Sequence, residues 1–242
     1  MRSQKPSMPN CEPISVLVET DEILAINKPA GLATTGRTLD DPDCLQYRAI
    51  DHAGQMVWAL HQLDRDTSGV ILFARHKRGV AEWQSMWNST AIQKFYVALV
   101  HGSLPDQSMT VDAALRRLDR GSYTEVLVDD EDGKPAKTRL WQLSTNGRYS
   151  LVLAKPITGR THQVRVHLQY AGSPLIGEKR YNAIPCGHHH RHALHALAIC
   201  TNQPAPLGRI EAPLADDLYR PAETLEIDLE PLENWAVRVA ND

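Results

Sequence analysis

Polar side chains of the kinds that catalyse reactions lie together in His61–Gly69, which reads HQLDRDTSG. The segment joins two apolar runs that predict buried strands, and a loop at strand ends is a common place for a catalytic carboxylate. The alternative is a tight turn in which Asp64 or Asp66 accepts backbone N–H groups and Gly69 supplies a positive φ. A turn is the more frequent use of such residues, and the segment by itself leaves both interpretations open.

A second segment, Arg160–Ala171, combines two histidines, two arginines and two glutamines, and its spacing predicts an amphipathic helix closed by Gly172. Thr158-Gly159 before it would leave the free N–H groups of the helix start facing an anion such as phosphate. The plainer alternative is a basic helix with a solvated polar stripe. The predicted apolar face holds Thr161, Val164, Leu168 and Ala171, and the polar stripe holds His162, Arg165 and Gln169.

A third cluster, His188–His192, suggests zinc, with Cys186 as the one nearby thiol. A structural zinc site needs fixed ligands from separate elements, and no CxxC or HExxH motif accompanies these histidines. A histidine-rich surface loop is therefore the better interpretation, and we predict no metal site.

The segment HQLDRDTSGVILFA resembles the H-R-L-D-x-x-T-S-G signature of the RluA family of RNA pseudouridine synthases. Six further blocks resemble the same family in the same order, so that seven blocks extend across about 170 residues. Chance does not produce such an ordered set. These blocks are NKPAGL at Asn27–Leu32, K-x-Y-x-A at Lys94–Ala98, GKPAKT at Gly133–Thr138, PITGRTHQVRVHL at Pro156–Leu168, G-x-P-L-I-G at Gly172–Gly177 and RHALHA at Arg191–Ala196.

The resemblance implies a reaction and the residues that perform it. A uridine within RNA would be isomerised: the N1–C1′ bond breaks, the base turns, and C5 bonds to C1′. Asp64 would be the catalytic carboxylate, which either forms an adduct with the sugar or base or removes the C2′ proton. Arg165 would pair with Asp64, and Tyr96 would pack against the base and assist proton removal from C5. Members of this family need neither a metal nor an organic cofactor.

The resemblance also implies RNA contacts, because the target nucleotide must be flipped out of its stack at a cost of a few kcal/mol. The family usually has arginine directly after the signature histidine, where it enters the RNA stack, whereas this chain has Gln62. Glutamine brings no charge and a smaller stacking plane, so either the flipping or the RNA target differs. The candidate RNA-binding residues are Gln62, Arg65, Arg160, His162, Lys179 and Arg180.

The charge distribution is compatible with RNA, although the net charge is −3. Residues 148–181 hold six basic residues and one acidic residue, and residues 211–242 hold two basic and nine acidic residues. Local patches rather than the total charge attract phosphate. An ordinary solvated surface with uneven charge is the alternative.

The order of apolar runs predicts an α+β domain on a mixed, mostly antiparallel sheet with flanking helices. The resemblance implies the pseudouridine synthase fold, with a central active-site cleft and Asp64 on its floor. We expect residues 1–13 to be a flexible tail and 14–242 a single catalytic domain without an added S4-like domain. Strands are predicted at 14–18, 23–27, 57–60, 70–74, 94–101, 122–128, 136–143, 149–154 and 193–200 and in short runs near the end, and helices at 77–89 and 160–171, with one short helix within 33–55.

Composition limits the setting in which the protein works. No apolar run approaches the roughly 18–20 residues that span a bilayer, and the N-terminus has no signal-peptide core, which predicts the cytoplasm. The cysteines, without CxxC spacing, are predicted to be reduced thiols. We expect a monomer whose partner is transfer RNA (tRNA), ribosomal RNA (rRNA) or both, and no membrane. The rival functions are an inactive RNA-binding protein on the same fold and a zinc-dependent hydrolase.

Overall fold

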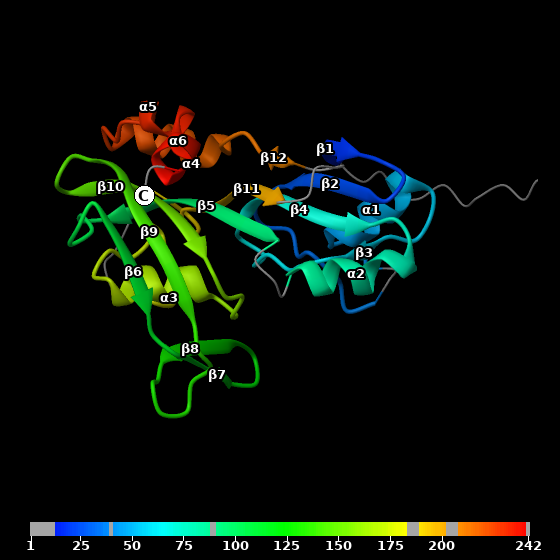
Figure 1. The fold of residues 1–242 in the computed structure, drawn as a ribbon, viewed down its shortest axis with the longest axis horizontal. Coiled ribbons are helices and arrows are strands. Elements are labelled where there is room, and N and C mark those ends of the chain that lie inside the picture. Colours follow the sequence, from blue (N-terminus) through cyan, green and yellow to red (C-terminus); the bar gives the residue numbers. More distant parts are fainter. Residues whose placement is uncertain (1–12, 39–40, 88–90, 183–188, 202–207, 241–242) are drawn as a thin grey trace, which may run out of the picture. The chain divides into compact units, whose positions relative to one another are not determined.

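A computed structural model describes residues 13–38, 41–87, 91–182, 189–201 and 208–240 of the chain (Figure 1). These residues divide into two compact units. Unit 1 comprises the described residues of Met1–Ile92 and Thr201–Ala212, and unit 2 those of Gln93–Cys200 and Pro213–Asp242. The prediction of one domain over 14–242 stays a prediction, and the predicted tail lies outside the described residues except for Pro13.

Unit 1 is built on three antiparallel strands in the order β1-β2-β4, with the short strand β3 also paired with β4. Every residue of β4 is buried, as its unbroken apolar sequence predicts. Lys28, the last residue of β2, pairs with Gly69 near the start of β4, so the residues that follow β2 lie beside those that precede β4. The bounds are β1 Ser15–Glu19, β2 Ile23–Lys28, β3 Trp58–Ala59 and β4 Ser68–Ala74.

Two helices complete unit 1. The sulfur of Cys44 caps the first helix by accepting from the N–H of Tyr47, and left-handed Gly54 ends it. The second helix packs against β4 (Figure 1). A short strand at Arg209–Glu211, β12, lies near β1. The helices are α1 Leu45–Ala53 and α2 Lys77–Trp87, and both agree with the sequence prediction.

Unit 2 contains a five-stranded sheet in the order β11-β5-β10-β9-β6. All its strand pairs with a described register are antiparallel, so the predicted α+β class with a mostly antiparallel sheet is confirmed. The edge strand β6 was not predicted from the sequence, because two of its five residues are exposed and polar. The bounds are β5 Ile92–His101, β6 Ser108–Asp112, β9 Lys137–Thr145, β10 Tyr149–Pro156 and β11 Leu194–Thr201.

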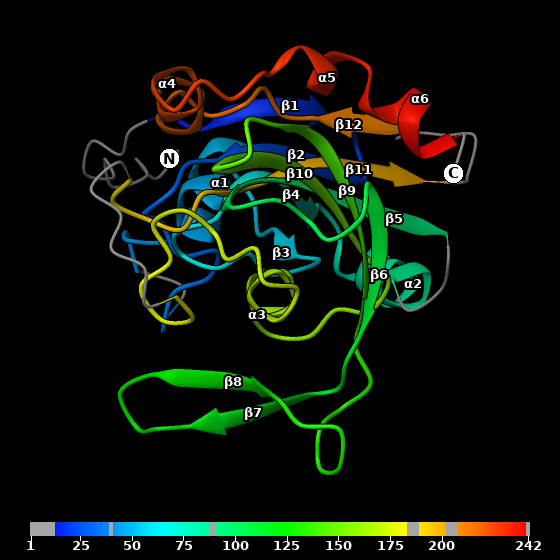
Figure 2. The same ribbon diagram turned by 90° about the vertical axis from the view of Figure 1, so that its left-hand side faces the viewer.

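The two faces of this sheet bury different sets of side chains, because successive residues of a strand point to opposite faces. Phe95, Val97 and Leu99 of β5 pack in one core with the C-terminal helices. Ala98 and Val100 pack in a second core with α3 (Gln163–Tyr170), which lies on the other face (Figure 2). Each face of the sheet is therefore covered by helix.

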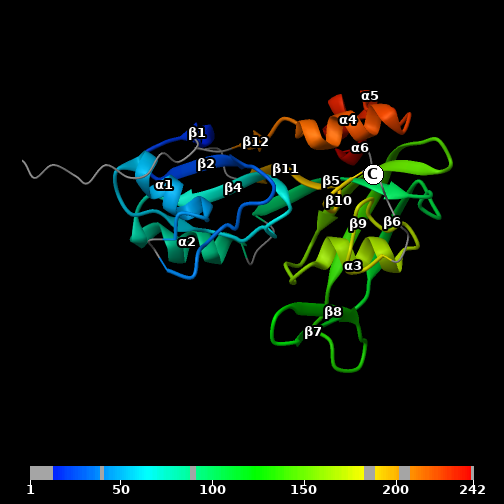
Figure 3. The same cartoon turned by 180° about the vertical axis from the view of Figure 1, so that it is seen from behind.

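Beyond α3, a hairpin of β7 (Leu115–Asp119) and β8 (Thr124–Val128) forms a separate two-stranded sheet in unit 2 (Figure 3). Val166 of α3 packs with Leu115 and Val126 of the hairpin. Strand β8 was predicted from the sequence, but β7 was not. The reason is that four of the five β7 residues are partly or fully exposed, so β7 carries little apolar signal.

The prediction of short strands near the C-terminus is wrong for most of that region. Residues 216–240 form three helices, and among the described residues after β11 only β12 is a strand. Two acidic residues stabilise the first turn of α4, and its buried residues Leu218 and Ala222 are spaced four apart as on one helix face. The helices are α4 Asp216–Thr224, α5 Glu230–Glu233 and α6 Trp235–Ala240.

The predictions about membrane spans and cysteines can also be compared with the structure. Among the described residues, no helix is both long enough and apolar enough to span a membrane. Cys44 and Cys200 are not in a disulfide in this part of the chain, and Cys11 and Cys186 lie outside it.

Candidate active site

The loop that carries Asp64 is held by a fully buried lysine. The Nζ of Lys28 donates to the carbonyl oxygens of Pro29 at 2.9 Å, Leu32 at 2.7 Å and Arg65 at 2.8 Å, and none of the residue is exposed. A buried ammonium group is tolerated only when hydrogen bonds replace its water. Lys28 therefore ties the NKPAGL block to the residue directly after Asp64.

Further hydrogen bonds join the same two segments. The hydroxyl of Thr34 donates to the carbonyl of Leu63 at 3.0 Å and accepts from the N–H of Leu63 at 3.1 Å. The Nε of Arg65 donates to the carbonyl of Gly31 at 2.7 Å. The backbone on both sides of Asp64 is thus fixed by residues about thirty positions earlier in the chain.

The segment does form a tight turn, as one interpretation predicted. The N–H of Thr67 donates to the carbonyl of Asp64 at 3.0 Å, and Gly69 has a φ of +109°. Asp64 itself is partly buried, whereas Arg65 and Asp66 are exposed. A turn and a catalytic aspartate are compatible, because the hydrogen bond of the turn uses the backbone carbonyl of Asp64 and not its side chain.

His61 and Gln62, the first two residues of the signature, contact different neighbours. The Nε2 of His61 accepts from the N–H of Leu72 at 3.1 Å, and its ring stacks on Trp87 with ring centroids 4.5 Å apart. Gln62 is exposed, and its Oε1 accepts from the hydroxyl of Thr35 at 3.4 Å. The histidine is therefore structural, and Gln62 is the accessible member of the pair.

Tyr96 lies in unit 2, on β5. It is partly buried and packs with the core on the sheet face that α3 covers. Burial lowers the pKa of Lys94, two residues earlier in the same block. The sheet thus fixes Tyr96 on the face that carries α3.

The approach to α3 differs from the prediction. The helix begins at Gln163, three residues later than the sequence indicated, because His162 has a left-handed φ of 52°. Arg160 lies before the helix, exposed, and its Nε donates to the carbonyl of Pro135 at 3.0 Å. The prediction that Arg160 begins the helix is therefore wrong.

Gln163 fixes this start with all four of its amide hydrogen bonds. Its Oε1 accepts from the hydroxyl of Thr158 at 2.7 Å and from the N–H of Arg160 at 2.9 Å. Its Nε2 donates to the carbonyl of Lys137 and to the hydroxyl of Thr138, both at 2.9 Å. The side chain is almost fully buried, so every polar atom is satisfied inside the protein.

The network continues to His167, which is also fully buried. Its Nε2 lies 3.1 Å from the carbonyl of Ala113, which can only accept, so Nε2 carries the proton. Its Nδ1 then accepts from the hydroxyl of Thr138 at 2.8 Å. Burial lowers the pKa of His167 despite this carbonyl, so the ring is neutral at pH 7.

Arg165 does not lie on a solvated stripe. It is 8% exposed, and its guanidinium makes a bidentate ion pair with Glu178, whose side chain is also buried. Of the predicted stripe only Gln169 is exposed, and His162 precedes the helix. The solvated interpretation of Arg165 is wrong because an ion pair offsets the cost of burying its charge.

The other candidate RNA-binding residues of unit 2 are exposed, apart from His162, which is partly buried. Lys179 and Arg180 are exposed, and the guanidinium of Arg180 lies over the ring of Tyr123 at 5.2 Å and donates to the carbonyl of Thr124. The Nδ1 of His162 is hydrogen-bonded to the hydroxyl of Tyr181 at 2.6 Å. Lys179 and Arg180 carry charge that phosphate can reach.

The histidine cluster falls partly outside the described residues, since His188 is not among them. His189 is buried, and neither ring nitrogen has a hydrogen-bond partner in the described part of the chain. Burial, followed by the charge of Arg191, lowers its pKa to about 4. Within the described ranges, no three His, Cys, Asp or Glu residues are grouped as metal ligands would be.

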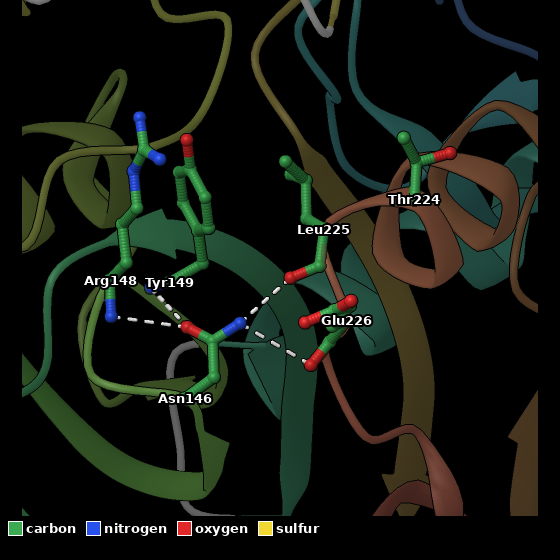
Figure 4. A pocket seen from close by; sticks show the side chains of 6 residues that line it. All are labelled: Asn146, Arg148, Tyr149, Thr224, Leu225 and Glu226. Atoms are coloured by element: carbon green, nitrogen blue, oxygen red, sulfur yellow. Dashed lines mark hydrogen bonds between the residues drawn. The ribbon is translucent and has the colours of Figure 1, made fainter.

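A cavity of about 420 Å³ lies elsewhere in unit 2 (Figure 4). The amide of Asn146 spans it, donating to the carbonyls of Leu225 at 2.7 Å and Glu226 at 3.3 Å. Its Oδ1 accepts from the N–H groups of Arg148 and Tyr149. None of the predicted site residues lines this cavity, so it belongs to the anchoring of the turn before β10.

The structure therefore divides the predicted site residues between the units. Unit 1 holds Asp64, Gln62 and Arg65, and unit 2 holds the rest. Five residues that hold these site residues in place had no role predicted from the sequence. These five residues are Lys28, Thr34, Gln163, Glu178 and Tyr181. The available signals in the sequence were the positions of Lys28 and Gln163 inside motifs and the position of Glu178 as the single acidic residue among basic ones.

Comparison with known proteins identifies the class of protein. A family model described as RNA pseudouridylate synthase matches residues 22–170. The chain belongs to this family and is an RNA pseudouridine synthase, an isomerase, as the resemblance implied. The match includes Asp64, Tyr96 and Arg165 but ends before Glu178.

Similar proteins agree in name and fold. Ribosomal large subunit pseudouridine synthase C of Vibrio vulnificus is 34% identical over 87% of this chain and 69% of its own length. The enzyme of the same name from Salmonella typhi is 34% identical with the same coverage. Human RNA Pseudouridylate Synthase Domain Containing 4 shares the fold with a TM-score of 0.74 and 21% identity, over 88% of this chain and 93% of that one. Human RNA Pseudouridylate Synthase Domain Containing 1 shares the fold with a TM-score of 0.69 and 24% identity, over 91% of this chain and 97% of that one.

Proposed function

We propose that this synthase isomerises a uridine in the RNA of the large ribosomal subunit. The observation that carries the proposal is the similarity to synthases named for that subunit, which extends over 87% of the chain. We place the protein in the cytoplasm as a monomer, and tRNA is the alternative substrate. Both substrates share the same chemistry at the uridine.

Asp64 is the proposed catalytic carboxylate. Its backbone is fixed on both sides by the bonds to Lys28 and Thr34, which supports a role that needs a defined position. The carboxylate forms an adduct with the sugar or base, or removes the C2′ proton, and the N1–C1′ bond breaks.

Arg165 and Tyr96 are proposed to assist. A guanidinium keeps a carboxylate ionised and oriented, because opposite charge lowers a carboxyl pKa. Tyr96 packs against the turned base and assists loss of the C5 proton, and it lies on a sheet strand whose neighbours fix it. The RNA is proposed to be held by phosphate contacts with exposed basic side chains, of which Arg160, Lys179 and Arg180 are examples.

The target base is proposed to be flipped out, with Gln62 entering the vacated stack. The exposure of Gln62 and the length of its hydrogen bond to Thr35, 3.4 Å, support this, because a long hydrogen bond breaks easily when the side chain moves. A neutral side chain there favours a uridine that is already weakly stacked, where flipping costs least.

The test is pseudouridine mapping by mass spectrometry in cellular RNA with and without this gene, followed by assays on purified RNA. We expect one large-subunit rRNA site to lose pseudouridine, and the full-length protein to restore it in a transcript. Asp64→Asn keeps the shape but removes the charge, so turnover should fall by several orders of magnitude while RNA binding remains. If pseudouridine were lost only from tRNA, tRNA would replace rRNA as the proposed substrate. If the unaltered protein bound RNA without turnover, it would be an inactive RNA-binding protein.

A further inference from the structure

Arg165 is held by the carboxylate of Glu178, which lies between two of the sequence blocks and beyond the end of the family match. Its Nε donates to Oε2 of Glu178 at 2.7 Å, and its Nη2 donates to Oε1 at 2.8 Å. The two residues are 8% and 5% exposed. A bidentate pair of this kind admits a single relative geometry, so Glu178 determines where the guanidinium plane lies.

Glu178 is charged in this position. Burial alone would raise its pKa, but the hydrogen bonds and charge of Arg165 and the N–H groups of Arg180 and Tyr181 outweigh burial, so the pKa lies below its usual value. The pair is therefore neutral as a whole and adds no net charge that would attract RNA. What the pair contributes is the orientation of Arg165.

The backbone that presents Glu178 is also fixed. Gly177 has a φ of +72°, and a Cβ at this position would lie only 2.0 Å from the carbonyl oxygen of Arg191. The N–H of Ile176 donates to the carbonyl of Leu99 on β5 at 2.9 Å. The carboxylate therefore extends from a turn that is anchored to the central sheet of unit 2.

Tyr181 supports the other side of the same guanidinium, which lies over the tyrosine ring at 5.2 Å. The Tyr181 hydroxyl accepts from the N–H of Val126 at 3.2 Å, so its proton is available to donate to Nδ1 of His162 at 2.6 Å. Burial raises the pKa of Tyr181, which keeps this proton in place. The ring is thereby held between β8 and the residue before α3.

A second ion pair in unit 2, between Arg191 and Asp217, is also bidentate but joins different elements. Nε and Nη2 of Arg191 donate to the two carboxylate oxygens of Asp217, both at 2.7 Å. The Nη1 of Arg191 donates to the carbonyls of His192 and Leu194. This guanidinium joins the start of β11 to α4 and belongs to no block with a proposed catalytic role, so the pair is a matched structural control.

We infer that Glu178 is a positioning residue for Arg165, with the ring of Tyr181 as a second support. The inference rests on the proposed function, which gives Arg165 its role in the reaction. Glu178 does not touch RNA in this account: it sets the place of a group that does the work, and a displacement of about 1 Å can cost roughly 100-fold in rate.

The test measures tritium release from a transcript labelled at C5 of uridine, in single turnover at saturating RNA, with the full-length protein. Glu178→Gln removes the charge at constant size, so we expect the rate to fall about 100-fold while the Kd for RNA changes by less than about threefold. Glu178→Asp keeps the charge and should recover part of the rate. If Glu178 acts through Arg165, adding Glu178→Gln to Arg165→Met should slow the reaction no further.

The control is Asp217→Asn, which breaks the matched pair. We expect it to lower the urea midpoint while the rate per folded protein stays within about twofold of the unaltered enzyme. A Glu178→Gln enzyme that behaves like Asp217→Asn would overturn the inference, as would a double variant much slower than Arg165→Met. If the unaltered protein modifies no RNA, the proposed function fails; if it is active and Glu178→Gln is equally fast, only the inference fails.

Discussion

The loop around Asp64 in unit 1 and the start of α3 in unit 2 are both held in place by hydrogen bonds from polar side chains, but the bonding partners differ. The first is held by a lysine and a threonine that bond to backbone carbonyls and an N–H group. The second is held by side chains that bond mainly to one another, through Gln163, His167 and the Arg165–Glu178 pair.

The difference lies in what each arrangement fixes. Bonds to the backbone set the path of the loop and are indifferent to the side chain of Asp64, which stays partly accessible. Bonds between side chains set the orientation of one group, the guanidinium of Arg165. Unit 1 is therefore expected to be most sensitive to loss of a donor, and unit 2 to loss of a matched partner or to a change of charge.

The largest effect on stability is expected from Lys28→Met. The side chain keeps its length but no longer donates to three carbonyls, and each buried acceptor left without a donor costs about 1–3 kcal/mol. The free energy of unfolding should fall by roughly 3–5 kcal/mol in urea denaturation. The control is Lys77→Met on an exposed position of α2. Equal losses in the two variants would show that the three carbonyls do not depend on Lys28.

Gln163→Leu should lower the free energy of unfolding somewhat less than Lys28→Met. Arg160 and its neighbours are exposed, so water can replace part of the hydrogen bonding that the variant loses. The variant leaves the N–H of Arg160 without its side-chain acceptor, whereas the carbonyl of Lys137 loses one donor and keeps the N–H of Ile157. We expect a loss of about 2–4 kcal/mol and faster amide exchange at the start of α3. Gln169→Leu, on an exposed position of the same helix, is the control. Unchanged exchange at 163–166 would contradict the role of Gln163.

Acid should weaken unit 2 through its buried neutral histidines. The pKa of His189 is about 4 and that of His167 is lowered by burial, whereas unfolded histidine titrates near 6.5. The folded state therefore binds fewer protons, so this stability is complete above pH 6.5 and is lost as the pH falls towards 4. His167→Asn should reduce the slope of the urea midpoint against pH in that window. An identical slope would show that His167 does not titrate on unfolding.

The smallest effect is expected at Gln62, which contributes little to the fold. Gln62→Arg should leave the urea midpoint unchanged and tighten RNA binding by about 0.5–2 kcal/mol, the value of a cation–π or phosphate contact. It should also relax the demand for a uridine in a loop, measured as single-turnover rates on a stem-loop and a paired target. Gln62→Ala is the comparison. Identical rates and affinities for all three proteins would exclude Gln62 from flipping.

The sequence by itself determined the family, the reaction class and most of the framework. The ordered blocks identified the family that the comparison confirmed. Buried strands such as β4 and β10 were predictable because their apolar runs are continuous. The C-terminal helices were not, because residues 216–240 alternate short apolar runs with proline and acidic residues and fit no single period.

Only the tertiary structure decided which polar residues support the site. Periodicity put Arg165 on a polar stripe, and it cannot distinguish a charge facing water from one facing a buried carboxylate thirteen residues away. The same holds for Lys28, whose acceptor at Arg65 lies 37 positions further along the chain. A polar side chain is buried only when the fold brings it a partner, and that partner is set by the packing of strands and helices rather than by local sequence.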